Sequence, residues 1–181
     1  DPQEGMVDVG QLTFTPANWD VPQTVSVTGV DDSIVDGHAE YLVVLGPAST
    51  NDGNYMGLNP ADVALVNQDD DEAALTLGIS ATEVAESGSV LATVTRNTNT
   101  SAPLTVNVSS DDPGEASVPT TVTIEAGANS AEFAIAGVDD SIVDGDQPAT
   151  ITVELSGYQN DSEAIVVTDA NQPALSLTLA D

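Results

Sequence analysis

The sequence predicts an all-β protein made of tandem seven-stranded immunoglobulin-like Greek-key sandwiches, of which the first repeat is partial. Apolar residues make up 40% of the chain, and most are Val, Ala, Leu and Ile interleaved with Thr and Ser, a composition typical of strands. The nonapeptide GVDDSIVDG occurs at residues 29–37 and again, without a mismatch, at residues 137–145. An identical segment at two positions indicates a repeated structural unit.

Seven runs of alternating apolar residues lie within the one complete copy, and each predicts a strand. Turn-forming residues separate them: Glu86-Ser87-Gly88 before the second run, Asp112-Pro113-Gly114 after the third, Ala126–Asn129 after the fourth and Ser156-Gly157 after the sixth. Seven short strands in about 100 residues are typical of an immunoglobulin-like sandwich. In chain order, the predicted strands are residues 75–80, 89–96, 104–109, 120–125, 131–136, 148–156 and 164–168.

A second pair of matching segments gives the limits of the repeats. Ala74-Leu75-Thr76-Leu77 matches Ala174-Leu175-Ser176-Leu177. The two matches predict the C-terminal part of one repeat at residues 1–72, a complete repeat at 73–173 and the first strand of a following repeat at 174–181.

The charge of the chain limits its binding partners. Thirty Asp and Glu stand against a single basic residue, Arg96, and the formal net charge is −29. Such a surface repels nucleic acid and attracts cations, and no apolar run is long enough for membrane insertion. Cysteine is absent, which excludes disulfides and thiolate zinc sites and favours another metal as a stabilising element.

The predicted strand order sorts the acidic residues to one pole of the complete sandwich. If successive strands run up and down, the first, third and fifth loops and the exit of the last strand share one end. The opposite loops contain only Asp161 and Glu163. The acidic residues of the shared end are Glu83, Glu86, Asp111, Asp112, Glu115, Asp139, Asp140, Asp144, Asp146 and Asp169.

Acidic side chains that converge in this way predict a calcium site. Two carboxylates about 5 Å apart repel by about 3 kcal/mol at an effective dielectric of 20, and Ca²⁺ relieves this repulsion with six to eight oxygen ligands. Zinc prefers His or Cys, which are nearly absent. The candidate ligands of the complete repeat are Glu86, Asp111, Asp112, Asp139, Asp140, Asp144 and Asp169, enough charge for two or more ions. Those of the partial repeat are Asp31, Asp32, Asp36, Asp69, Asp70 and Asp71.

Several motifs resemble the Calx-β domain, which occurs in sodium–calcium exchangers and as tandem repeats in large bacterial extracellular and surface proteins. They are Val84-Ala85-Glu86-Ser87-Gly88, the two GVDDSIVDG segments and Gln68-Asp69-Asp70-Asp71. The resemblance implies a sandwich of the Calx-β type that binds calcium at one pole. By residue match it assigns Glu86, Asp112, Asp139, Asp140 and Asp144 as ligands in the complete repeat, and the six Asp residues in the partial one. The chain departs from the pattern at Ala170 and Asn171, and the choice between Asp111 and Asp112 stays open.

Together these features predict a calcium-binding structural or adhesive repeat region of a secreted or cell-surface bacterial protein. Calcium at the acidic pole is expected to rigidify the joint between neighbouring repeats of the same array. An enzyme is not expected, because the chain has one histidine and no nucleophile or phosphate-loop motif.

Other functions are also consistent with the sequence. A glycan- or protein-recognition module, an adhesin or an appended domain of a secreted enzyme, would use Trp19 or the loop 51–60, although we expect Trp19 to pack and anchor its turn. A strand-exchanged extracellular filament, a homopolymer, would place residues 174–180 in a neighbouring chain. A calcium sensor would need an affinity near cytosolic calcium levels.

Overall fold

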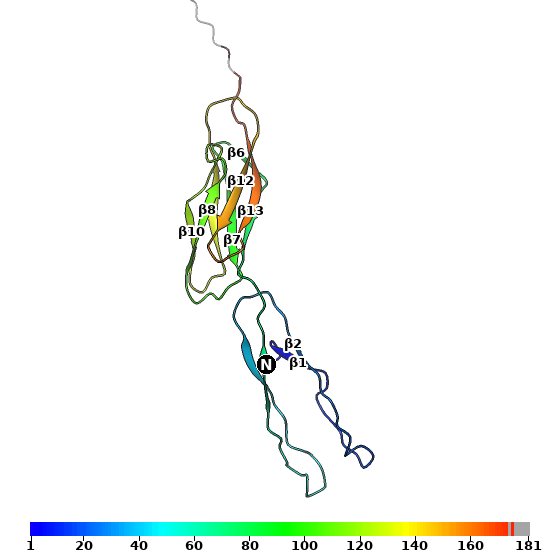
Figure 1. The fold of residues 1–181 in the computed structure, drawn as a ribbon. Helices are drawn as coiled ribbons and strands as arrows, with labels where there is room; N and C mark the ends of the chain where they lie inside the picture. Colours follow the sequence, from blue (N-terminus) through cyan, green and yellow to red (C-terminus); the bar gives the residue numbers. More distant parts are fainter. Residues whose placement is uncertain (174, 176–181) are drawn as a thin grey trace, which may run out of the picture. The chain divides into compact units, whose positions relative to one another are not determined.

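The computed structural model describes residues 1–173 and residue 175, and these fold entirely into strands, turns and loops (Figure 1). They form two compact units, Asp1–Asp71 and Glu72–Asp181. The predicted opening strand of a third repeat, residues 174–181, lies outside the described residues except for Leu175. No helix among the described residues is long and apolar enough to cross a membrane.

The second unit is a β-sandwich of two sheets. The first sheet has the order β5 (Leu75–Ile79), β7 (Ser89–Arg96), β11 (Ser130–Gly137) and β9 (Ala116–Ser117). The second has the order β10 (Thr121–Ile124), β8 (Leu104–Ser110), β12 (Gln147–Glu154), β13 (Asp161–Thr168) and β6 (Glu83–Ala85). All neighbouring strands pair antiparallel except β6 and β13, which are parallel.

Alternate side chains of both sheets form one apolar core. Along β12, for example, Ala149, Ile151 and Val153 are buried, because successive residues of a strand point to opposite faces. Ile135 of the first sheet and Ile165 of the second belong to the same core. The prediction of an all-β sandwich is therefore confirmed for this unit.

Among the described residues, the sandwich has nine strands rather than the predicted seven. Each of the seven predicted runs contains a strand, and the two additional strands are β6 and β9. Strands of three and two residues are too short to show an alternating pattern in the sequence. Whether such a segment forms a strand depends on the neighbouring strand with which it pairs.

The buried end of β7 carries the only basic side chain of the protein. Arg96 is 5% exposed, and its guanidinium group donates to the carbonyl oxygens of Ala102 and Ala128, each at 2.9 Å. Arg96 therefore ties two loops of the sandwich together through neutral acceptors.

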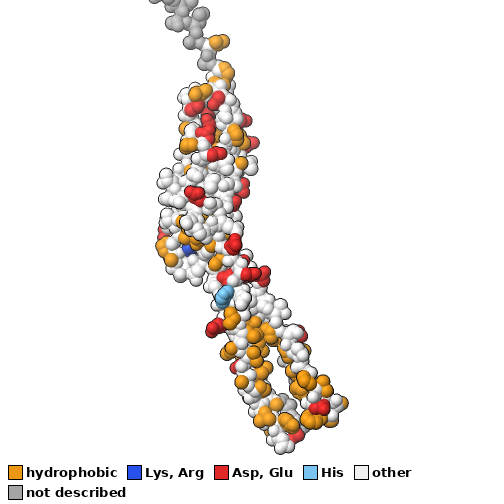
Figure 2. Space-filling view, viewed as in Figure 1, with side chains coloured by type: hydrophobic (Ala, Val, Ile, Leu, Met, Phe, Trp, Pro, Cys, Tyr) orange, Lys and Arg blue, Asp and Glu red, His pale blue; other side chains and the backbone are white. Residues whose placement is uncertain are grey.

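The first unit contains two separate strand pairs and is not a complete sandwich. β1 (Gly5–Val7) pairs with β2 (Val27–Gly29), and β3 (Ala39–Val43) pairs with β4 (Val63–Asn67), both antiparallel. No side chain of residues 1–71, all of which the structure describes, is buried. Hydrophobic side chains accordingly lie exposed over much of this unit (Figure 2). The expected tandem arrangement of sandwiches is thus not seen in these residues.

The pairing in the first unit repeats part of the pairing in the second. Gly29 pairs with Gly5 as Gly137, its counterpart in the repeated nonapeptide, pairs with Ala116. β3 and β4 pair antiparallel in the same positions of the repeat as β12 and β13. The strands of the first unit therefore correspond to β9, β11, β12 and β13.

Candidate metal centre

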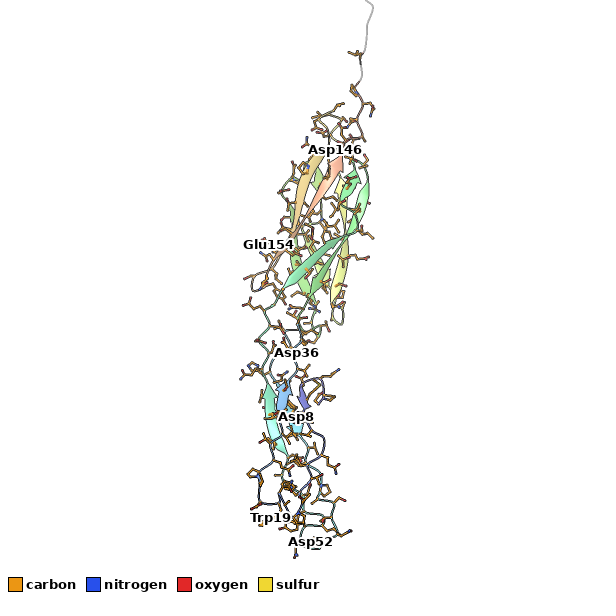
Figure 3. The ribbon with its side chains drawn as sticks, turned by 90° about the vertical axis from the view of Figure 1, so that its right-hand side faces the viewer. Asp8, Trp19, Asp36, Asp52, Asp146 and Glu154 are labelled. Carbon is orange, nitrogen blue, oxygen red and sulfur yellow. The ribbon has the colours of Figure 1, made fainter. Side chains whose placement is uncertain are left out.

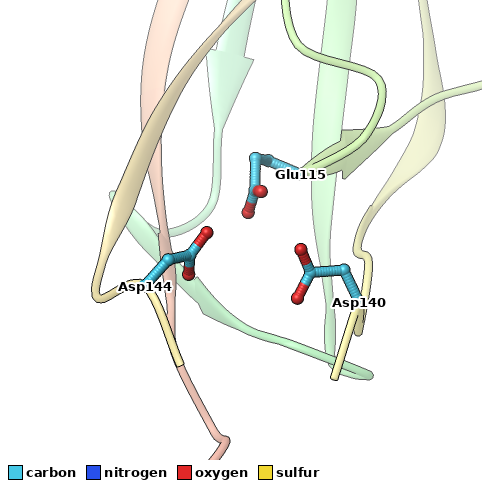
Figure 4. A group of neighbouring side chains, drawn as sticks. All are labelled: Glu115, Asp140 and Asp144. Atoms are coloured by element: carbon cyan, nitrogen blue, oxygen red, sulfur yellow. The ribbon is translucent and has the colours of Figure 1, made fainter. Parts of the chain in front are cut away.

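Three carboxylates converge at one end of the second unit. Glu115, Asp140 and Asp144 each offer an oxygen atom, and these oxygen atoms lie within 4.8 Å of one another (Figure 4). Glu115 directly precedes β9, while Asp140 and Asp144 lie in the loop between β11 and β12. Two loops that are distant in sequence thus supply one group of acidic side chains.

Backbone hydrogen bonds hold Glu115 against the other two residues. The Val138 N–H donates to the Glu115 carbonyl oxygen at 2.8 Å, and the Ala116 N–H donates to the Asp112 carbonyl oxygen at 2.9 Å. The pKa of the Glu115 carboxyl is raised, first by burial and then by the charges of Asp144 and Asp140. The group therefore carries repulsion that a bound cation relieves.

The repeated nonapeptide shapes the loop that carries the two Asp residues. The Asp139 carboxylate accepts from the Ser141 N–H at 3.0 Å, and the Asp140 carboxylate accepts from the Ile142 N–H at 2.8 Å. Ser141 and Gly145 have positive φ angles of 64° and 86°. The Asp side chains thus stabilise the turns that point them to the pole.

The turn that carries Glu86 and the segment that follows β13 are joined by the side chain of Asn171. Glu86 is 6% exposed, and its carboxylate accepts from the Ala170 N–H at 3.1 Å and from Asn171 Nδ2 at 2.8 Å. The same Asn171 nitrogen lies 3.2 Å from an oxygen of Asp139. A neutral amide thus bridges two acidic side chains that were predicted to bind the ion.

Asp169 anchors the exit to the nonapeptide loop. Its carboxylate accepts from the Gly145 N–H at 3.0 Å and from the Asn171 N–H at 2.7 Å. These hydrogen bonds to the charged form, that from Gly145 first, lower the pKa of Asp169.

The two neighbouring candidates of the third loop have different surroundings. The Asp111 carboxylate accepts from the Thr150 N–H at 2.6 Å and is not part of the three-carboxylate group. The Asp112 carboxylate accepts from the Gly114 N–H at 3.1 Å, and its charge contributes to the raised pKa of Glu115. Of the two, Asp112 is the residue that acts on the group.

In the first unit, the six predicted Asp residues line one recess together with a glutamate. Glu4 was not predicted as a ligand. It occupies the position that Glu115 has in the second unit, because each directly precedes a paired strand. The Glu4 carbonyl accepts from the Val30 N–H, as the Glu115 carbonyl accepts from the Val138 N–H. The acidic side chains of the recess belong to Glu4, Asp31, Asp32, Asp36, Asp69, Asp70 and Asp71.

The exit of the first unit is held like that of the second. The Asp69 carboxylate accepts from the Gly37 N–H at 2.6 Å and from the Asp71 N–H at 3.0 Å. Its pKa is lowered, mainly by these two bonds. The Asp69 N–H donates to His38 Nδ1 at 3.0 Å. At the equivalent position of the second unit, the Asp169 N–H donates to the Asp146 carboxylate at 3.2 Å.

Asp71 marks the main difference between the two poles. It holds the position of Asn171, and its pKa is raised, first by burial and then by the charge of Asp69. The first unit therefore has an uncompensated carboxylate where the second unit has an amide donor.

Glu4 and Glu115 were not among the predicted ligands, and the register of the repeat is the feature that could have identified both. Glu115 was placed at the acidic pole, but nothing in its identity separated it from the other acids of its loop. The register of the repeat aligns it with Glu4 once Gly5 and Ala116 are recognised as equivalent paired residues.

The chemistry of both groups fits a hard divalent cation. All candidate ligands are oxygen atoms, and calcium accepts six to eight of them from flexible acidic loops. The only basic side chain, Arg96, is buried and bonded to carbonyl oxygens of other loops. No Lys or Arg side chain is therefore left to neutralise either group.

The opposite end of the first unit exposes aromatic side chains. Trp19 and Asp52 lie at one end of this unit and Asp36 at the other (Figure 3). Trp19 is 66% exposed and Tyr55 is 55% exposed. The expectation that Trp19 packs to anchor its turn was wrong, because no core forms at this end.

Comparison with known proteins gave similarities to solved structures only. No protein-family model and no curated protein matches the chain. The apo form of the Calx CBD1 domain has a TM-score of 0.42 and 13% identity over 54% of this chain and 99% of that one. A glycosyl hydrolase family 2 member from Bacteroides cellulosilyticus has a TM-score of 0.44 and 12% identity over 92% of this chain and 22% of its own. The E. coli chaperone DraB has a TM-score of 0.36 and 18% identity over 54% of this chain and 56% of its own.

Proposed function

We propose that the chain is a calcium-binding structural repeat region of an extracellular protein, without catalytic activity. The observation that supports this most directly is the group of Glu115, Asp140 and Asp144, whose oxygen atoms lie within 4.8 Å of one another. Like charges at this separation repel, and a chain with a net charge of −29 has little positive charge of its own to offset that repulsion, so a bound cation would stabilise the group.

The two poles are proposed to differ in capacity. In the second unit, Asn171 already bridges Glu86 and Asp139, so Ca²⁺ binds mainly at the three-carboxylate group. In the first unit, seven acidic side chains line the recess and Asp71 stands where the second unit has Asn171, so more charge is neutralised there.

Calcium is also proposed to restrict motion at the joint between the units. Asp71, the last residue of the first recess, is followed directly by Glu72, whose carbonyl accepts from Asn97 Nδ2 at 3.0 Å within the second unit. The Gln159 N–H donates to the Ala73 carbonyl at 2.8 Å. The proposed ligands Asp69–Asp71 therefore adjoin a segment, Glu72–Ala73, that is hydrogen-bonded to the second unit. A calcium ion bound to Asp69–Asp71 would leave few rotatable backbone bonds between that ion and the anchored segment.

Thermal unfolding with and without calcium tests the function. Binding only the folded state adds about 2.7 kcal/mol at a hundredfold excess over Kd, which corresponds to a rise in Tm of about 10 °C or more for a unit of this size. Excess Ca²⁺ is expected to raise Tm relative to a chelator, and equimolar Mg²⁺ to raise it much less. Equal Tm values in Ca²⁺ and in chelator would refute the proposal.

The affinity distinguishes the extracellular proposal from a calcium sensor. Isothermal titration is expected to give Kd values near 10⁻⁴–10⁻³ M, typical of extracellular modules. A submicromolar Kd would instead favour a cytosolic sensor.

Recognition of a glycan or protein is a second candidate, favoured by the 66% exposure of Trp19. Binding of the protein to a glycan array that is lost on Trp19→Ala, with the Tm of the second unit unchanged, would support it. Glycan binding that survives this substitution, or no binding at all, would exclude Trp19 as a recognition residue.

A further inference from the structure

Three Asp–Gly peptide bonds occur in the chain, and two of them belong to the repeated nonapeptide. They are Asp36–Gly37, Asp52–Gly53 and Asp144–Gly145. An Asp–Gly bond is prone to rearrangement, because glycine has no Cβ atom to hinder attack by its own nitrogen on the preceding Asp side chain, and its backbone adopts a wide range of angles. The surroundings of the three bonds therefore decide which of them reacts.

The rearrangement is the isomerisation of Asp to isoaspartate. The glycine nitrogen loses its proton and attacks the carbon of the Asp side-chain carboxyl, whose hydroxyl leaves with a proton as water, so that a cyclic imide forms. Water then adds to the main-chain carbonyl of the imide, and the bond from that carbon to the glycine nitrogen breaks as the nitrogen regains a proton. The backbone now runs through the Asp side chain and is longer by a methylene. The composition is unchanged, because the water that was lost is regained.

Both nonapeptides hold the glycine nitrogen in a hydrogen bond to a carboxylate. The Gly145 N–H donates to the Asp169 carboxylate at 3.0 Å, and the Gly37 N–H donates to the Asp69 carboxylate at 2.6 Å. A negatively charged acceptor stabilises the proton on the nitrogen and disfavours the amide anion that must form before attack. These hydrogen bonds therefore oppose the first step of the isomerisation.

The Asp side chain of the second nonapeptide is also directed elsewhere. The Asp144 carboxyl points toward those of Glu115 and Asp140, and oxygen atoms of the three groups lie within 4.8 Å of one another (Figure 4). Attack by the Gly145 nitrogen thus requires that its hydrogen bond opens and that the Asp144 side chain turns back. Both changes need a local opening of the loop.

The third bond, Asp52–Gly53, lies in the exposed loop between β3 and β4 and has neither feature. None of the described residues accepts a hydrogen bond from the Gly53 N–H. A Cβ atom on Gly53 would have nothing within 4 Å. The Asp52 carboxylate accepts from the Asn54 N–H at 2.9 Å and from Asn54 Nδ2 at 3.0 Å. These two bonds hold the carboxyl group beside the peptide that follows it and draw electron density from its carbon, which favours attack.

We propose that Asp52 isomerises to isoaspartate, and that Asp69 and Asp169 protect Asp36 and Asp144 from the same reaction. The two protecting residues, each of which follows the last strand of its unit, thereby keep the acidic loops chemically intact. Isomerisation within a nonapeptide would lengthen its backbone and displace a proposed calcium ligand, whereas the loop between β3 and β4 carries no such ligand. The protecting hydrogen bonds need no ion, so this proposal and calcium binding succeed or fail separately.

Incubation of the folded full chain in chelator, at physiological pH and temperature, tests the proposal. A protease that cuts before Asp but not before isoaspartate, followed by mass spectrometry, reports each site, and oxygen-18 water labels each imide that has been hydrolysed. The rate at Asp52 is expected to exceed the rates at Asp36 and Asp144 by at least about tenfold, because a hydrogen bond to a charged group must first open there. Equal rates at the three sites, or no isoaspartate at Asp52, would overturn the proposal.

Two controls connect these rates to the folded surroundings. In urea the three bonds are expected to react at similar rates, since the hydrogen bonds of the folded protein are lost. Gly53→Ala places a methyl group in open space and is expected to suppress the labelling of Asp52. A difference between the three sites that persists unchanged in urea would contradict the proposal, because it would belong to the local sequence.

Substitution of Asp169 tests the protecting role. Asp169→Ala removes the acceptor of the Gly145 N–H and is expected to raise the rate at Asp144 by about tenfold or more. Asp111→Ala is the matched control, because it removes another carboxylate of this pole, one that accepts from the Thr150 N–H at 2.6 Å, and leaves the Gly145 bond in place. Equal rates at Asp144 in the two variants would show that general loosening, and not the loss of protection, exposes the bond.

A milder substitution keeps the test valid if the alanine variant does not fold. The amide oxygen of Asp169→Asn still accepts from the Gly145 N–H but carries no charge. The rate at Asp144 is therefore expected to lie between those of the unmodified protein and the unfolded chain in urea. Thermal unfolding verifies that the variant is folded at the temperature of incubation. A rate equal to that of the unmodified protein would refute the role of the charge.

Discussion

Glu115 is the residue at which the repulsion within the three-carboxylate group is most evident. Its carboxyl lies with Asp140 and Asp144, and its pKa is raised by burial and by these two charges. The charged form of this side chain is therefore destabilised by its surroundings, and under the proposed function a bound cation would offset that cost.

Glu115→Gln is expected to have opposite effects in the two states. Without calcium it raises Tm at pH 7, because one repelling charge is lost. With calcium it weakens binding by at least about tenfold, since loss of even an outer partner of a metal ligand costs about 10–100-fold. Titration calorimetry and thermal unfolding measure both effects. Glu132→Gln, an exposed residue of β11, is the control, and equal behaviour of the two variants would contradict the role of Glu115.

Asn171 allows a test of why the two poles differ. Asn171→Asp replaces the amide that bridges Glu86 and Asp139 with the acid found at Asp71. The variant is expected to lower Tm in chelator and to bind at least one more Ca²⁺ per chain in calorimetry. Asn171→Ala also loses the bridge but gains no ligand, so its calcium stoichiometry should not rise. An unchanged stoichiometry in Asn171→Asp would show that the amide does not limit this pole.

At the scale of elements, Gly137 lets two segments of the pole come together. Its N–H donates to the Gly88 carbonyl, and its carbonyl accepts from the Ser87 N–H, each at 3.0 Å. A Cβ atom on Gly137 would collide with the Ala85 carbonyl oxygen. The first residue of the nonapeptide is thus glycine because the turn that carries Glu86 packs directly on it.

Gly137→Ala is expected to push this turn away from β11. The stability of the second unit should fall by about 1–3 kcal/mol, as for other overpacked sites, and calcium affinity should fall with it. Urea unfolding measures the first effect. Gly78→Ala in β5 is the matched control, since nothing lies within 4 Å of a Cβ there. A Gly137→Ala protein as stable as the control would contradict this packing.

Asp111 links the end of β8 to β12, and its titration should be visible in stability. Hydrogen bonds from Thr150 lower its pKa below the ordinary value of 3.8. A carboxyl whose pKa is lowered in the folded state stabilises the protein at pH values above its unfolded-state pKa. This stabilisation is lost as the pH falls through the folded-state pKa. Asp111→Asn should therefore lower Tm at pH 5 and flatten the loss of stability below about pH 4. Parallel pH profiles of variant and unmodified protein would contradict this.

The elements show which parts of the fold could be predicted from sequence. Long alternating runs such as β7 and β12 were predicted closely, because a core face fixes their period. β6 and β9 were missed because pairing partners, not local pattern, define strands of three and two residues. The bridging role of Asn171 was also missed, since it depends on where the exit meets the first turn.

At the scale of the whole molecule, a net charge of −29 makes stability depend on salt. Charges repel over about 10 Å at 0.1 M ionic strength and over about 3 Å at 1 M. In chelator, Tm is expected to rise steadily as NaCl increases, with KCl giving the same curve. In saturating Ca²⁺ the rise should be smaller, because the densest groups of charge are already neutralised. Equal salt dependence in the two conditions would indicate that calcium does not bind at the acidic poles.

The burial of Arg96 also affects how proteases act on the protein. A trypsin-like protease cuts after Lys or Arg, and this chain of 181 residues offers it a single bond, that between Arg96 and Asn97. The Arg96 side chain is 5% exposed and lies at the end of a paired strand. Trypsin is therefore expected to cut this chain only when the sandwich opens, so the rate of cleavage would report how often that opening occurs.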